Sequence, residues 1–219
     1  MIISLEKPQH AAAIEDLLDR AFGPDRQKKT AYRLRDGVDP IDGLSFVAIE
    51  HDDAGNEVIV GTIRYWPILI GGQHEAILLG PIAVEDRLQG SGLGSKLIRM
   101  SLAKAAELGH KAVILVGDAP YYERFGFSRS MTLDMQMPGP VELARFLGLE
   151  LVPGALKGAS GMIGRISSAR EAVSAPSAKT KALAGCDSDE SDRVTGLELP
   201  LSAMPAEKSF LPIKRLCIA

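Results

Sequence analysis

Apolar residues recur at helical spacing near the start of the chain. Five of them lie on one side of a helical turn, with charged residues between them: Ile14, Leu17, Leu18, Ala21 and Phe22. This pattern predicts an amphipathic helix that begins near Pro8 and ends at Gly23-Pro24. A short strand is expected at 2–5, before this helix, and a second, more polar helix at 25–36, after it.

The apolar segments that follow have the composition and alternation of strands. They lie at 44–50, 57–66 and 74–84, and turn residues such as Gly71-Gly72 separate them. Three strands joined by short turns predict an antiparallel meander. Within the third segment, Gly80-Pro81 predicts a bulge or bend, because proline has no N–H to give to a sheet.

Helical spacing returns after the third strand. Apolar positions from Leu93 to Leu108 predict a helix of about four turns that stops at Gly109, and 112–116 is a short apolar run typical of a buried strand. The third strand, a glycine-rich loop, this helix and the new strand make a βαβ unit. Its two strands are expected to be parallel.

Weaker patterns follow. A short helix is expected at 121–125, a strand at 131–137 and another short helix at 141–147. Beyond residue 166 the composition shifts to small and charged residues with few large apolar ones. We therefore expect one mixed α/β domain at 1–166, followed by a low-complexity linker and C-terminal tail of unknown role at 167–219.

Composition and charge exclude several classes of protein. The 219 residues are 46% hydrophobic and 24% charged, which is ordinary globular usage, and the formal net charge of −3 argues against a nucleic-acid partner. No segment has the roughly 20 apolar residues that cross a bilayer, and the N-terminus lacks a signal-peptide pattern. Cys186 and Cys217 lack the spacing of a zinc site. We expect a cytoplasmic protein with no metal, nucleic-acid or membrane partner.

The stretch with the clearest chemical meaning lies between the strand that ends at Val84 and the helix after it. It consists of seven consecutive residues: Gln89, Gly90, Ser91, Gly92, Leu93, Gly94 and Ser95. Glycines let a backbone approach a ligand closely, and the first turn of a helix offers unpaired N–H groups and a positive dipole end. The segment therefore suits a phosphate or pyrophosphate, although a simple tight turn before a helix stays open.

Known phosphate loops match this stretch to different degrees. A dinucleotide fingerprint needs glycine at position 95, which is Ser95, and a P-loop needs Gly-Lys-Ser/Thr where this chain has Gly94-Ser95-Lys96. The pattern that remains is Gln-x-x-Gly-x-Gly. A second motif, 121–127, follows the last strand of the βαβ unit, so Tyr122 is expected at the same end of the sheet as the glycine loop. Packing alone would also account for this tyrosine.

Together the two motifs resemble those of the GNAT superfamily of N-acetyltransferases, over about residues 1–166. The sequence is similar in particular to a bacterial subgroup with Gly-Asp-x-x-Tyr-Tyr before Phe-Gly-Phe, here 117–122. The resemblance implies a mixed, mostly antiparallel sheet with helices on both faces and one splayed parallel strand pair. It also implies acetyl-CoA as co-substrate, a primary amine on a small molecule or peptide as acceptor, and it allows a homodimer.

The resemblance assigns roles to residues of both motifs. Main-chain groups of Ile82 and Val84, with Ala83 between them, are expected to pair with the pantetheine arm of acetyl-CoA. The amides of Gln89 to Ser95 are expected to hold its pyrophosphate. Tyr122 is expected to act as general acid toward the leaving thiolate, since a phenol has an ordinary pKa near ~10 and a thiol one near ~8.5.

The general base has no clear candidate. Many relatives carry a glutamate about eleven residues before the glutamine, where this chain has Leu78, and neither His74 nor Glu75 matches that position. A non-catalytic acyl-CoA-binding regulatory module therefore stays open. A dinucleotide-binding oxidoreductase is a further alternative, with Ser95 against it.

Two other features border the expected acceptor pocket. Five basic residues gather after the first helix: Arg26, Lys28, Lys29, Arg33 and Arg35. They would attract an acidic substrate, but a solvated helix face is the favoured interpretation. Tyr65 and Trp66 would line the pocket or pack within the sheet.

Overall fold

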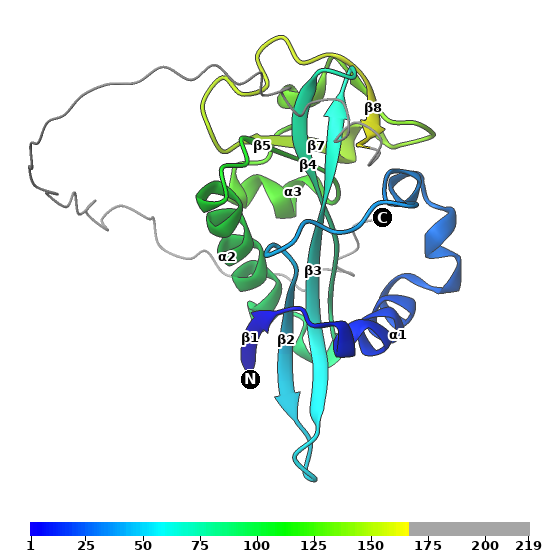
Figure 1. Cartoon of the computed structure of the whole chain (residues 1–219), viewed down its shortest axis with the longest axis vertical. Helices are drawn as coiled ribbons and strands as arrows, with labels where there is room; N and C mark the ends of the chain where they lie inside the picture. The colour runs from blue at the N-terminus through cyan, green and yellow to red at the C-terminus, as the bar shows by residue number, and fades with distance from the viewer. Residues whose placement is uncertain (167–219) are drawn as a thin grey trace, which may run out of the picture.

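An open sheet runs the length of the molecule (Figure 1). The computed structural model describes residues 1–166, so the expected tail and both cysteines lie outside the described residues. The main path of the sheet follows the order β1-β2-β3-β4-β5-β7. Its strands are β1 (Ile2–Leu5), β2 (Phe46–His51), β3 (Glu57–Ile70), β4 (His74–Val84), β5 (Ala112–Val116) and β7 (Phe146–Glu150).

The pairing along this path is antiparallel except between β4 and β5. This confirms the predicted meander of β2, β3 and β4 and the predicted parallel βαβ pair. Two further strands lie at the end of β3: β8 (Gly161–Arg165) pairs with β3 in antiparallel and with β6 (Met135–Gln136) in parallel. The fold is the mixed, mostly antiparallel sheet that the sequence led us to expect.

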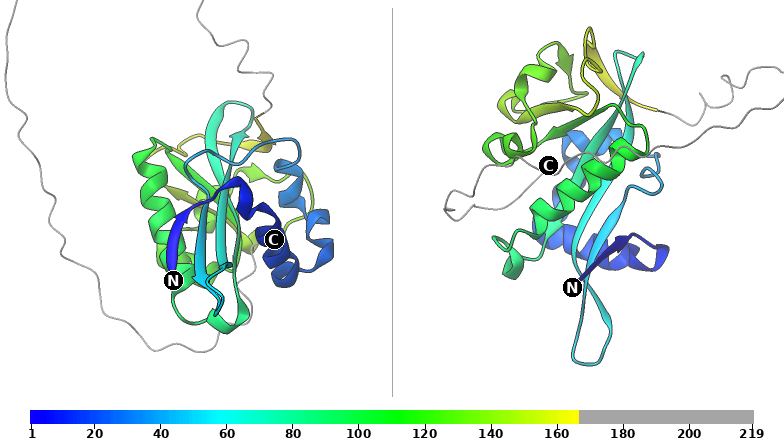
Figure 2. Two further views of the ribbon diagram at one scale, coloured as in Figure 1. Left: turned by 60° about the horizontal axis from the view of Figure 1, so that its bottom comes forward. Right: turned by 90° about the vertical axis from the view of Figure 1, so that its left-hand side faces the viewer.

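Two long helices cover opposite faces of the sheet, because successive residues of a strand point to opposite sides (Figures 1 and 2). α1 (Ala11–Phe22) packs Ile14, Leu17 and Leu18 against a cluster that contains Val47 and Ile49 of β2. α2 (Leu93–Glu107) packs into a second cluster, which contains the alternate β2 residues Phe46 and Ala48. The third helix, α3 (Ala119–Tyr122), follows β5 directly.

Two neighbouring residues of β3, Tyr65 and Trp66, point to opposite faces of the sheet. Tyr65 faces α2, where its hydroxyl lies 2.7 Å from the Ser101 hydroxyl. Trp66 lies on the other face, and its indole N–H donates to the carbonyl of Val38 at 3.1 Å. The aromatic pair is therefore divided between two clusters, and only Trp66 lies on the side where 24–38 packs.

Strands β4 and β5 separate soon after they meet. They pair only at Ile77 with Val113 and at Leu78 with Ile114, whereas β4 continues beside β3 as far as Val84. The predicted bend is present as a register shift between β3 and β4 and a cis Gly80-Pro81 peptide bond. The expected splayed parallel pair is thus confirmed.

Three local predictions were wrong. The segment 25–36 forms two 3-10 helices, Pro24–Lys28 and Thr30–Leu34, because Lys29 between them has an extended backbone. The segment 131–137 contains only the short β6, and a 3-10 helix at Arg129–Thr132 precedes it. Buried Thr132 fixes that turn by donating its hydroxyl to the carbonyl of Phe146 at 2.6 Å.

The third error concerns 141–147, which is a 3-10 helix at Leu143–Arg145 followed by the first residues of β7. Gly148 interrupts the apolar run of β7, and a Cβ there would lie 2.9 Å from that of Met131. Glycine permits this close approach, but it has a low strand propensity, so the sequence of β7 does not predict a strand by itself. The strand is stabilised by its pairing with β5. Two more 3-10 helices complete the described elements near the site, Asp86–Leu88 and Glu123–Phe125, and one at Pro8–His10 precedes α1.

Candidate active site

The glycine loop lies at the N-terminus of α2. Gly90 and Gly92 have left-handed backbone angles, φ 83° and 86°, and a Cβ on either would meet nothing within 4 Å. The space above the loop is therefore open to a ligand. Gly92 caps the helix by accepting from the N–H of Lys96, which leaves the N–H groups of Gly94 and Ser95 without an intrahelical acceptor.

Side chains of the loop bond within it. The amide nitrogen of Gln89 donates to the Asp86 carboxylate at 2.7 Å, and the hydroxyl of Ser91 donates to the carbonyl of Leu88 at 2.6 Å. Main-chain bonds add to them, because the N–H groups of Gln89 and Ser91 donate to the carbonyls of Asp86 and Leu88 at 3.1 and 3.2 Å. The N–H groups of Gly94 and Ser95 remain as donors that can meet an anion. Arg87 is turned away from this task, because it forms an ion pair with Glu50.

Tyr122 lies behind the split between β4 and β5. Its ring shares a core cluster with Leu79 and Ile82, two β4 residues beyond the last pair with β5. The side chain is 1% exposed, and within residues 1–166 its hydroxyl has no hydrogen-bond partner. Burial raises the pKa of this phenol well above its ordinary value, so Tyr122 carries its proton at neutral pH.

Gly117 allows Tyr122 to take this position. A Cβ at Gly117 would lie 2.8 Å from Cδ2 of the tyrosine, so a larger residue and the ring exclude each other. Gly117 follows the last residue of β5, and its N–H donates to the carbonyl of Arg145 at 2.8 Å. Asp118 begins α3 but makes no side-chain cap bond.

The structure brings the two sequence motifs together through Tyr121. Its hydroxyl lies 3.4 Å from that of Ser95 in the first turn of α2. Arg124 stacks on its ring at 4.2 Å, and Arg99 stacks on Phe125 at 5.4 Å. Sequence reasoning singled out neither Tyr121 nor Arg124. Tyr121 and Arg124 are three residues apart, about one helical turn, and this spacing could have indicated that their side chains meet.

The other residues considered as bases lie away from the split. His74 and Glu75 begin β4, and His74 is four residues, about 13 Å of strand, before Leu78. They line a separate cleft of about 420 Å³ together with His110 and Lys111. Leu78 is buried where β4 and β5 last pair, so the position of the relatives' glutamate is apolar here.

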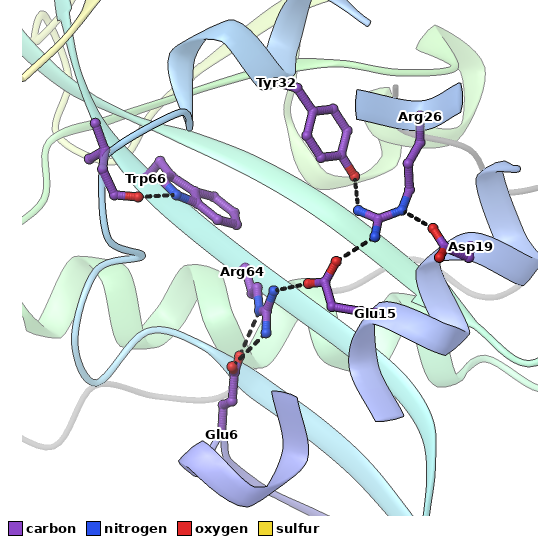
Figure 3. Close-up of polar contacts among 8 residues, drawn as sticks. Glu6, Glu15, Asp19, Arg26, Tyr32, Arg64 and Trp66 are labelled. Carbon is purple, nitrogen blue, oxygen red and sulfur yellow. Dashed lines mark hydrogen bonds and ion pairs between the residues drawn. The ribbon is translucent and has the colours of Figure 1, made fainter. Parts of the chain in front are cut away.

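The basic cluster is not a solvated face, contrary to the favoured interpretation. Arg26 is buried and donates to Asp19 at 2.6 Å, to the hydroxyl of Tyr32 at 2.7 Å and to Glu15. Arg64 of β3 donates to the other oxygen of Glu15 at 3.0 Å (Figure 3). The carboxylate of Glu15 thereby ties the segment after α1 to the sheet.

A second set of contacts extends this network. Arg64 also donates both remaining nitrogens to Glu6, at 2.6 and 2.8 Å. Arg33 is exposed and donates to the carbonyl of Pro138 at 2.9 Å. Lys28 is exposed and pairs with Asp25. Only part of the predicted cluster, therefore, is solvated.

Arg35 differs from both buried neighbours. Its guanidinium carbon lies 4.6 Å from the ring centroid of Tyr32 and 5.0 Å from that of Trp66. The residue is 7% exposed, and in the described part of the chain none of its three side-chain nitrogens has a partner that meets hydrogen-bond geometry. Burial lowers the pKa of this guanidinium to about 10, so it remains charged at neutral pH.

Comparison with known proteins bears on this arrangement. The sequence model described as the Acetyltransferase (GNAT) family matches residues 11–127, which is more than half of the chain and includes both motifs. The chain belongs to the GNAT acetyltransferase family. The sheet of this GNAT chain is mostly antiparallel, so the doubly wound parallel sheet of a dinucleotide-binding oxidoreductase is excluded.

Two relatives of this GNAT chain are especially informative. The uncharacterized N-acetyltransferase YhbS of Escherichia coli K12 is 30% identical over 165 residues, which is 74% of this chain and 95% of YhbS. The crystal structure of Escherichia coli YhbS in complex with CoA aligns with a TM-score of 0.63 and 30% identity, over 75% of this chain and 89% of that one.

The second relative is a GNAT family acetyltransferase from Brucella melitensis in complex with acetyl-CoA. It is 34% identical, with a TM-score of 0.50. The alignment spans 69% of this chain and 88% of the Brucella melitensis chain. Within residues 1–166, no helix is long and apolar enough to cross a membrane. In the same range, His, Cys, Asp and Glu side chains form no group of three or more that could hold a metal ion.

Proposed function

We propose that this GNAT chain transfers the acetyl group of acetyl-CoA to a primary amine by direct attack in a ternary complex. The observation that carries the proposal is the hydroxyl of Tyr122, which is buried behind the split without a partner. A buried hydroxyl in that state costs about 1–3 kcal/mol. A ligand atom that accepts its hydrogen bond, such as the sulfur of CoA, would remove this cost.

The glycine loop supplies the binding site for the pyrophosphate in this proposal. We assign the main-chain amides of Gln89 to Ser95 to it, beside the open space at Gly90 and Gly92. The N–H groups of Gly94 and Ser95 have no helical acceptor, whereas those of Gln89 and Ser91 would have to leave the carbonyls of Asp86 and Leu88. Arg99 and Arg124 add positive charge beside the same turn. The two relatives were solved in complex with CoA and acetyl-CoA, which supports a ligand of this class for the present chain.

The split supplies the binding site for the pantetheine arm. Beyond Leu78, β5 no longer pairs with β4, so alternate main-chain groups on one edge of β4 have no strand partner there. Ile82, Ala83 and Val84 lie on this edge segment and pair with β3 on the other side. We assign them to the pantetheine amides, which would replace the missing strand.

Tyr122 would assist departure of the thiolate chiefly as a hydrogen-bond donor. A phenol is a weaker acid than a thiol, and burial weakens Tyr122 further, so complete transfer of its proton to sulfur is uphill. In the balanced reaction the amine nitrogen forms a bond to the acetyl carbon, the carbon–sulfur bond breaks, and a proton of the amine ends on the CoA thiol. The hydroxyl of Tyr122 stabilises negative charge on sulfur while this happens.

Leu78 favours a second candidate, a non-catalytic acyl-CoA-binding regulatory module, because a buried leucine cannot accept the proton of the amine. If the chain is an enzyme, the ammonium form of its acceptor loses its extra proton to solvent before the attack, and the neutral amine then reacts as described above. Rates should then rise with pH as the amine becomes neutral. We place either activity in the cytoplasm, with the homodimer retained as a prediction.

Calorimetry and a thiol-release assay test both candidates on the full chain. We expect CoA to bind, and we expect acetyl-CoA to release thiol with at least one member of a broad panel of primary amines. Binding of acetyl-CoA without thiol release across the panel would favour the regulatory module. Absence of CoA binding at millimolar concentration would overturn both.

A further inference from the structure

Arg35 holds a buried charge that no side chain of the fold neutralises. Of the buried polar atoms without a hydrogen-bond partner in residues 1–166, only those of Arg35 belong to a permanently charged group. A buried guanidinium normally pairs with a carboxylate, because the loss of hydration is otherwise uncompensated. This orphan therefore points to a partner outside the described chain.

The neighbouring arginines show what such a partner looks like. Arg26 and Arg64 are also buried, and each bonds two carboxylates (Figure 3). The acids they use are the three nearby ones: Glu6, Glu15 and Asp19. None of these three pairs with Arg35. The charges of Arg26 and Arg64 act on it unfavourably, and the favourable influence comes from the neutral hydroxyl of Tyr32. An added anion would complete the third pair.

The surroundings of Arg35 favour a small planar anion. The rings of Tyr32 and Trp66 lie against the guanidinium, with centroids 4.6 and 5.0 Å from its carbon, so its N–H groups are the part left to meet an anion once they are uncovered. A carboxylate matches that edge with two parallel hydrogen bonds. The nearby residues Leu34 and Val116 share the apolar cluster of Trp66, which favours a singly charged carboxylate over a more strongly hydrated phosphate.

The position of this group relates it to acyl transfer. Trp66 pairs with Leu78 of β4, and Leu78 is the last β4 residue that pairs with β5. Arg35 thus lies where the split begins, on the face of the sheet opposite α2 and Tyr65. An acceptor held there by one end would present its other end to the split.

From this geometry we propose that Arg35 binds a carboxylate of the acceptor, so that the substrates are amines that also carry an acid group. The inference rests on the proposed acetyltransferase function, which it makes more specific. The three guanidinium nitrogens are covered, so a neighbouring side chain moves when the acid binds. The carboxylate belongs either to a free amino acid or to a peptide.

The test compares acids with their uncharged amides. The probes are ω-amino acids from glycine to 6-aminohexanoate, each beside its carboxamide, and one tripeptide with a free or an amidated C-terminus. Binding to the full chain is measured by calorimetry in the presence of CoA, and acetylation by thiol release from acetyl-CoA. We expect at least one acid to bind tenfold or more tightly than its amide, and the peptide pair to show which source is used.

Variants assign the preference to Arg35. Arg35→Met should abolish the difference between acid and amide, and Arg35→Lys should reduce it, because lysine keeps the charge but not the planar fork. The matched control is Arg33→Gln, which removes an exposed charge two residues away and should keep the wild-type preference. If Arg35→Met does not fold, Arg35→Lys provides the comparison.

The outcomes separate this inference from the proposed function. Acetylation of amines with equal preference for acid and amide overturns the Arg35 site and leaves the transferase standing. Carboxylate binding that depends on Arg35, without any thiol release, supports the site and contradicts the transferase. An unchanged acid preference in Arg35→Met overturns the proposal, and so does the absence of any acid preference in the wild type.

Discussion

The hydroxyl of Tyr121 lies 3.4 Å from that of Ser95, and this contact joins the two motifs of the candidate site. Ser95 belongs to the first turn of α2, and Tyr121 directly precedes Tyr122 in α3. The contact therefore fixes the distance between the loop assigned to the pyrophosphate and the phenol assigned to the thiolate. In the proposed complex, the adjacent residues Tyr121 and Tyr122 would therefore set the spacing between the two ends of acetyl-CoA.

Removal of the Tyr122 hydroxyl should separate catalysis from binding. We expect Tyr122→Phe to lower kcat about 100-fold and to leave the KM for acetyl-CoA within about twofold. The same variant should be about 1 kcal/mol more stable, since it removes a buried hydroxyl without a partner. Steady-state kinetics and urea unfolding measure the two effects. Tyr65→Phe, which removes a buried hydroxyl bonded to Ser101, is the control, and equal losses of kcat in both variants would contradict the assignment.

Gly117 should tolerate no side chain. We expect Gly117→Ala to lower the free energy of unfolding by about 1–3 kcal/mol, because its Cβ would meet the buried ring of Tyr122. Gly164→Ala is a suitable control, since a Cβ there meets nothing within 4 Å. Urea unfolding of both variants checks this prediction. A neutral Gly117→Ala would mean that the ring can move away without cost.

Two buried arginines should respond oppositely to the same substitution. Arg26→Met removes hydrogen bonds to Asp19 and Glu15, whose carboxylates are about half exposed and regain water, so we expect a loss of about 1–3 kcal/mol. Arg35→Met removes a buried charge that has no partner, so we expect unchanged or higher stability. Thermal unfolding of the two variants at equal concentration measures the contrast. Equal destabilisation would indicate that Arg35 has a structural role.

His110 should make the fold less stable in mild acid. Burial lowers its pKa below the ordinary value, and Glu75 opposes that shift. As the pH falls through about 6.5, the unfolded chain therefore takes up a proton before the folded chain does, and stability falls until the folded pKa is passed. We expect His110→Asn to lose less stability than the wild type between pH 7.5 and 5.5. His51→Asn, at an exposed position, should behave like the wild type.

Elements with their own local signal could be predicted from the sequence. The meander, α1, α2 and β5 each have a clear apolar period, and Gly109 and Gly126 mark true ends. β7 and β8 could not be predicted in this way, because glycines interrupt both strands and their pairing partners are distant in sequence. When a strand is stabilised mainly by pairing with segments distant in sequence, its own residues give little indication that it is a strand.

The same distinction holds for the candidate site. The glycine loop could be proposed from sequence, because close backbone approach and helix capping leave a local pattern, whereas Tyr122 was proposed through the family resemblance. The burial of Arg26 and Arg35 could not be found, because it depends on Arg64 and Trp66 of a separate strand. A run of basic residues looks solvated until the fold supplies aromatic and acidic neighbours.

The divided orientation of Tyr65 and Trp66 restricts how this chain can change in length. Deletion or insertion of one residue in the middle of β3 would exchange the two sides of the strand, turning Arg64 toward α2 and Tyr65 toward the acidic side chains of α1. Such a change would disrupt the packing on both faces of the sheet. Length variants of β3 should therefore survive only at its outer hairpin, at 52–56, where the chain turns in solvent.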